Sequence, residues 1–169
     1  MEKPVYYGFI TNEQLIVSYL SSAMENYFYK KLPKDDPIYV RLKICELLKY
    51  LLLCFYSKGQ IPFTEELDTL WHLWILQTKQ YQELMYKLPG GQFIHHSSID
   101  YLDSDSNKIN DENEINRQTS FLVSYVLNFG GFSEETVRFW PLAINIMTIH
   151  KFKVDDLNTY LHEMACQFS

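Results

Sequence analysis

The chain has 169 residues, 47% of them hydrophobic and 16% aromatic, and its formal net charge at neutral pH is −6. This length and composition predict a single domain over residues 1–169 with a substantial hydrophobic core. No basic face is visible, which argues against nucleic-acid binding, because nucleic-acid-binding domains gather Lys and Arg on one surface.

The sequence also predicts a protein of a reducing compartment that does not span a membrane. No apolar run approaches the roughly 20 residues that a membrane-spanning helix needs. Residues 1–4 do not begin a basic stretch followed by an apolar one, so we expect no secretory signal. Cys45 and Cys54 fall in one expected helix, roughly 13 Å apart along its axis, which is too far for a disulfide. We therefore expect the chain to remain in, or be delivered to, a cytosol.

Apolar residues recur at helical spacing almost throughout, and they predict an all-α fold of about six helices. A capping box opens the first helix, and an Asp-Pro pair opens the second. The second is apolar on several sides and is expected to be central. Strand signal is limited to Val5–Ile10. The expected helices are 11–32, 36–57, 64–87, 114–128, 133–149 (with a kink or restart at Pro141) and 155–164.

Residues 97–114 are polar, acidic and without periodicity, so we expect a long surface loop. Part of it, residues 103–114, matches a calcium-binding EF-hand loop at positions 1, 3, 5, 9 and 12. Lys108 stands at position 6, where the sharp turn of an EF-hand needs Gly. A solvated acidic loop is therefore the favoured interpretation, and calcium binding is not expected.

Potential metal ligands concentrate between residues 68 and 96. Asp68 and His72 are four residues apart, so on a helix they point to the same place, at one border of the apolar face. His95 and His96 follow after a Gly-Gly turn. Neighbouring residues of an extended chain point to opposite sides, so only one of these two histidines is expected to reach Asp68 and His72.

Two imidazoles and one carboxylate suit iron with open coordination positions, or zinc with a bound water. The predicted metal ligands are thus Asp68, His72, and His95 or His96. Tyr81 and Trp71 are candidates to support these ligands from behind, although an aromatic residue in an apolar stripe is more often part of the core. The alternative for the Asp68–His72 pair is a hydrogen bond that only braces the helix.

The same stretch resembles the bacterial glycine-rich domain-containing proteins. These carry a helix of the form Val-Asp-Glu-Leu-Trp-His-x-x-Ile-Leu-x-Thr-x-x-Tyr, followed by Phe-Gly-x-x-x-His-His. This chain departs from the pattern at Met85, where the family often has Cys, and at Ser97 and Ser98, near which it tends to have Pro. The resemblance implies a helical fold and a shared histidine–aspartate cluster. The matching positions are Asp68, Trp71, His72, Ile75, Leu76, Thr78, Tyr81, His95 and His96, with Thr119 and Asn128-Phe129-Gly130 further on.

Two classes of function therefore stay open. The first is a metal-binding helical domain, for which no general base or substrate-binding set is apparent, so that enzymatic activity is undecided. The second is a protein-interaction or effector-like adaptor, in which the aspartate–histidine cluster is structural and the abundant aromatic residues form a binding face.

Overall fold

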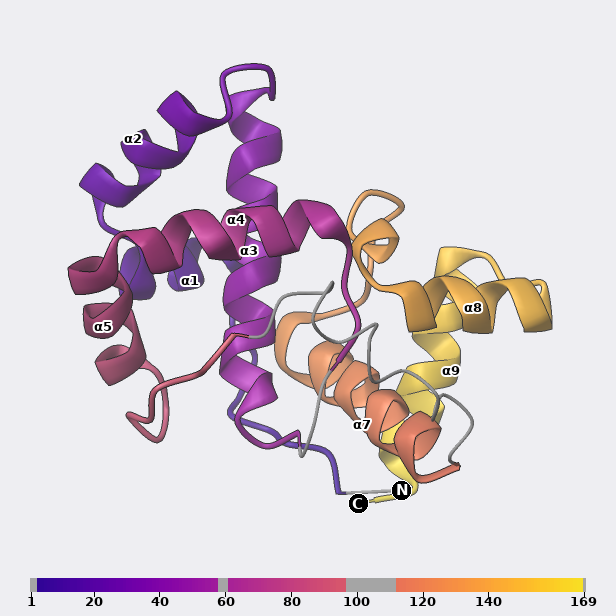
Figure 1. Cartoon of the computed structure of the whole chain (residues 1–169). Helices are drawn as coiled ribbons and strands as arrows, with labels where there is room; N and C mark the ends of the chain where they lie inside the picture. Colours follow the sequence, from indigo (N-terminus) through magenta and orange to yellow (C-terminus); the bar gives the residue numbers. More distant parts are fainter. Residues whose placement is uncertain (1–2, 58–60, 97–111, 169) are drawn as a thin grey trace.

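The computed structural model describes residues 3–57, 61–96 and 112–168, and within these ranges it is all-helical (Figure 1). The all-α prediction is confirmed, whereas the expected count of about six helices is too low. The described ranges contain eight α-helices, one short 3-10 helix and no strand. They are α1 (Asn12–Tyr19), α2 (Ser22–Lys31), α3 (Pro37–Cys54), α4 (Glu65–Leu76), α5 (Thr78–Lys87), α7 (Glu112–Phe129), η1 (Val137–Phe139), α8 (Pro141–His150) and α9 (Val154–Cys166).

The count differs because two expected helices are each divided in two. The first ends at Leu20, and Ser21 caps a new helix by accepting a hydrogen bond from the backbone N–H of Met24 at 3.2 Å. The third is interrupted at Gln77, whose backbone (φ −90°, ψ 69°) leaves the helical region. Further along, Pro141 begins α8 after η1, which is the restart that the sequence suggested.

Helix α3 is the centre of the molecule, as its apolar pattern predicted. It packs against α1, α2, α4 and α7, and 12 of its 18 residues are buried. Its aliphatic side chains join those of the other helices in one continuous hydrophobic core. Among the described residues, no helix is long and apolar enough to cross a membrane.

The middle of α3 also buries two charged residues, Glu46 and Lys49. The Lys49 ammonium lies 2.6 Å from a Glu46 carboxylate oxygen and donates to the hydroxyl of Tyr125 on α7. Tyr125 and the indole N–H of Trp140 both donate to the Glu46 carboxylate at 2.9 Å. A buried charge is tolerated when an opposite charge and hydrogen bonds surround it. Here these partners come from α3, from α7 and from Trp140, which precedes α8.

The strand-like residues 5–10 are not in a strand, but they lie beside α7 and are hydrogen-bonded to it. Asn128, which is fully buried, accepts from the backbone N–H of Tyr7 and donates to the carbonyl of Val5, both at 2.7 Å. Its own carbonyl accepts from the N–H of Ile10. The side chain and the backbone carbonyl of Asn128 together supply hydrogen bonds that a neighbouring strand would otherwise provide.

The expected acidic loop lies mostly outside the described residues. Residues 97–111 are not described, and the EF-hand-like stretch falls largely within them. Its last three residues, 112–114, belong to α7, which begins two residues earlier than predicted.

Candidate metal centre

Helix α4 brings Asp68 and His72 together, as their spacing predicts. The Nδ1 of His72 lies 3.1 Å from Oδ2 of Asp68. Asp68 is buried, whereas the side chain of His72 is 46% exposed, so the pair stands where the core meets solvent. This is the border position expected from the helical periodicity.

The third side chain arrives on the segment that follows α5. This helix stops at Leu88, and Gly90 and Gly91 then adopt positive φ values of 91° and 56°, which favour glycine. The chain turns back, and the backbone N–H of Ile94 contacts Sδ of Met85 at 3.3 Å. Residues 92–96 are thereby directed towards α4.

His96 completes the cluster and His95 does not. The Nε2 of His96 lies 3.0 Å from Oδ1 of Asp68 and 3.1 Å from Nε2 of His72, and its side chain is only 6% exposed. His95 is exposed, and its ring lies against Phe93. Asp68, His72 and His96 each offer a donor atom within 4.8 Å of the other two, which is a spacing that one metal ion could bridge.

The break at Gln77 gives Tyr81 a place behind the cluster. In an unbroken helix, Trp71 and Tyr81 would be about 15 Å apart along the axis. In the structure the indole N–H of Trp71 donates to the Tyr81 hydroxyl at 3.0 Å, and that hydroxyl donates to the Ile94 carbonyl at 2.7 Å. Trp71 also stacks on the His96 ring, with ring centroids 4.2 Å apart. Both candidate supporting residues therefore contact the segment that carries His96.

The electrostatic environment favours a neutral His96. Burial lowers the pKa of His96 below its ordinary value, and the neighbouring His72 lowers it further, although the Asp68 carboxylate opposes this shift. A neutral imidazole is the form that binds a metal.

One oxygen of Asp68 and one ring nitrogen of His72 compete for the same donor. The Nε2 of His96 faces both Oδ1 of Asp68, at 3.0 Å, and Nε2 of His72, at 3.1 Å, and it carries at most one proton to donate. One of these two contacts is therefore left without a proton, and an unsatisfied polar atom at a buried site is costly. The residues present thus fit a cation, which would satisfy this oxygen and both facing ring nitrogens.

The remaining histidines, His150 and His162, are exposed and stand apart from this cluster.

The Glu46–Lys49–Tyr125–Trp140 group was not predicted as a unit. Glu46 and Lys49 interrupt an apolar helix at i, i+3 spacing, which signals a buried pair, but Tyr125 and Trp140 are 76 or more residues away. This group is buried and its two charges are paired with each other, so removing one partner would leave the other charge uncompensated.

The chain matches no family model, no curated protein and no solved structure. The resemblance to the glycine-rich domain-containing proteins thus rests on the residues quoted for it.

Proposed function

We propose that the chain is a metal-binding helical domain in which Asp68, His72 and His96 hold one transition-metal ion. The observation that carries this proposal is the convergence of the Asp68 carboxylate and the two imidazoles of His72 and His96 on one point at the edge of the core. Nitrogen and oxygen donors at bonds of about 2.0–2.2 Å from a tetrahedral ion would stand roughly 3.3–3.5 Å apart. The contacts of 3.0 and 3.1 Å would need to open by a few tenths of an ångström, and the third pair of donor atoms, which lies within 4.8 Å, would need to take up the same spacing.

The donor set supports zinc or iron(II) and gives calcium or magnesium little advantage, because imidazoles favour transition metals. Two histidines and one carboxylate leave at least one coordination position free. The half-exposed His72 lies on the solvent side of the cluster, where water could fill that position. A bound ion would supply Lewis-acid chemistry there, and the residues around it would hold and orient its ligands.

Elemental analysis of untagged protein tests the proposal. We expect about one zinc or iron per chain, and His72→Ala should lose most of it. His95→Ala is the matched control, because His95 is of the same residue type and belongs to the same segment as His96 but is exposed and outside the cluster. Metal that survives His72→Ala, or that is lost equally in His95→Ala, would overturn the assignment.

The second candidate is an interaction protein in which Asp68, His72 and His96 only brace α4 against the following segment. Exposed aromatic side chains near the N-terminus favour it, since Tyr6 and Phe9 are both more than 60% exposed. Aromatic residues are enriched in the cores of interfaces. Under this alternative, a chelator should leave the melting temperature unchanged.

A further inference from the structure

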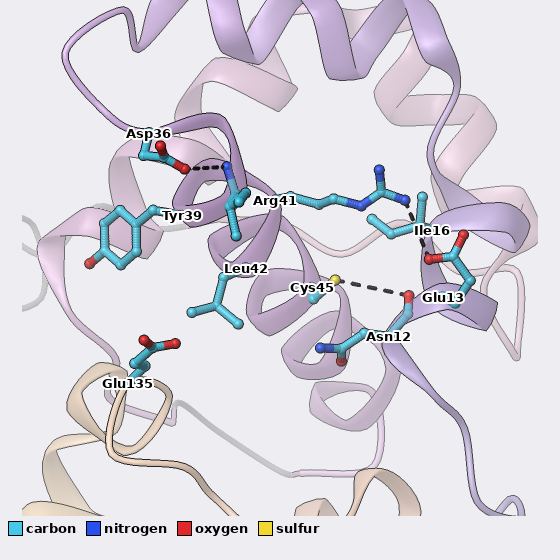
Figure 2. Close-up of a pocket in the computed structure, with 10 residues that line it drawn as sticks. Asn12, Glu13, Ile16, Asp36, Tyr39, Arg41, Leu42, Cys45 and Glu135 are labelled. Carbon is cyan, nitrogen blue, oxygen red and sulfur yellow. Dashed lines mark hydrogen bonds and ion pairs between the residues drawn. The ribbon is translucent and has the colours of Figure 1, made fainter.

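Away from the metal cluster, a cavity of about 450 Å³ lies between α1, α3 and the turn that precedes η1 (Figure 2). This volume is within the range of small-molecule binding sites. The cavity shares no lining residue with the cluster, so whatever it binds is independent of the proposed metal. Its lining residues include Asn12, Glu13 and Ile16 from α1, Asp36, Tyr39, Arg41, Leu42 and Cys45 from α3 and its cap, and Glu135.

The floor of the cavity is apolar. Ile16 and Cys45 are buried and Leu42 is half-buried. Burial raises the pKa of the Cys45 thiol to about 11, so the sulfur is uncharged at neutral pH. A hydrocarbon chain would fit this surface better than a polar one.

The rim has an excess of negative charge. Three carboxylates line it against one guanidinium, that of Arg41. Arg41 is already paired with Glu13 at 3.5 Å and with Glu25 at 3.1 Å. Glu135 has no hydrogen bond or ion pair with any residue in the described ranges. A ligand that brings positive charge would therefore complement this rim.

The carboxylates are placed on different sides of the apolar floor. Figure 2 shows Glu13 and Glu135 on opposite sides of the cavity, with Leu42 and Cys45 between them. We propose that this cavity binds an aliphatic diamine, with one ammonium group at Glu135, the other at Glu13, whose exposed carboxylate it would share with Arg41, and the methylene chain over Leu42 and Cys45. The lining has three acidic residues and one basic residue, so its net charge of −2 would be balanced by a dication.

A titration of metal-free protein with diamines from 1,4-diaminobutane to 1,8-diaminooctane, followed by amide NMR shifts, tests this proposal. Metal-free protein excludes coordination of the amine to a metal. We expect saturable shifts in α1, α3 and the turn around Glu135, with one chain length binding best. Hexylamine, which has one charge, should bind several-fold more weakly, and adipate should not bind.

Glu135→Gln should weaken diamine binding about 2- to 5-fold, the scale of an exposed ion pair. Glu163→Gln is the matched control, because it removes the same charge from an exposed position on α9. The proposal is overturned if no diamine saturates, if hexylamine binds as well as the best diamine, or if both variants weaken binding equally. The last result would mean that only the overall negative charge attracts the amine.

Discussion

At the scale of single residues, Tyr81 links the helical scaffold to the proposed metal ligands. Its hydroxyl accepts from Trp71 and donates to the carbonyl of Ile94, two residues before His96. Groups that orient metal ligands from behind commonly change metal affinity by about 10- to 100-fold when they are removed. Tyr81 is therefore expected to set the position of His96 without touching the ion.

Replacing Tyr81 by Phe should lower zinc affinity about 10-fold, because the His96 segment loses its anchor. Calorimetric titration measures this change. Tyr86→Phe is the matched control, since Tyr86 is on the same helix, is largely exposed and does not contact the cluster. Unchanged zinc affinity in a well-folded Tyr81→Phe variant would show that the hydroxyl stabilises the fold only.

His96 gives a second prediction, for the metal-free protein in chelator. Its pKa is lowered in the folded state, mainly by burial, so the unfolded chain binds more protons between the folded pKa and about 6.5. The free energy of unfolding should therefore fall as pH decreases from about 7 through this window, and should level off below the folded pKa. Urea unfolding at a series of pH values measures this dependence. His96→Gln should remove the part of this pH dependence that His96 causes. A wild-type protein that gains stability as the pH falls through the window would contradict the prediction.

At the scale of elements, α3 depends on the buried pair Glu46 and Lys49. Removing one partner of a buried ion pair typically costs about 3–5 kcal/mol, because the other charge stays buried without compensation. Lys49→Met should therefore lower the free energy of unfolding by roughly this amount, and adding Glu46→Gln should recover part of it. Urea denaturation provides the measurement. Lys79→Met, at an exposed position on α5, should change stability little; an equally small effect of Lys49→Met would contradict the prediction.

The elements also show what the sequence can and cannot predict. The all-α fold, the central position of α3 and the meeting of Asp68 with His72 follow from local spacing, which periodicity reports directly. The break at Gln77 does not follow, because no Gly or Pro marks it and tertiary contacts select it. The capping role of Ser21 was recognisable from residue type, yet the surrounding helical pattern masked it.

For the candidate site, too, the local features were predictable from the sequence and the long-range contacts were not. Its residue types and the pairing within α4 are local properties. The choice of His96 over His95 depends on the path of the chain after Gly90 and Gly91, and the contacts of Ile94 with Tyr81 and Met85 are part of what holds that path. Partners far apart in sequence, such as Glu46 with Trp140, cannot be inferred from local patterns.

At the scale of the whole molecule, a bound metal would join α4 to the segment that follows α5. A ligand present at 100 times its dissociation constant adds about 2.7 kcal/mol to the free energy of unfolding. For a chain of this size, that corresponds to a rise in Tm of roughly 5–10 °C. Thermal unfolding with zinc and with chelator should show this difference, and the His72→Ala variant should not. Equal Tm values for the wild-type protein in both conditions would favour the bracing role of the cluster.

The most direct test of the metal centre is a cobalt(II) titration followed by visible absorption, since cobalt reports its ligands through its colour. The wild-type protein and His95→Ala should each bind one cobalt ion per chain and develop the same absorption bands, which zinc should then abolish. His96→Ala should develop none at the same concentrations, because it lacks one of three ligands. If His96→Ala binds cobalt as the wild-type protein does, or if the wild-type protein itself develops no bands, then Asp68, His72 and His96 do not form a metal site.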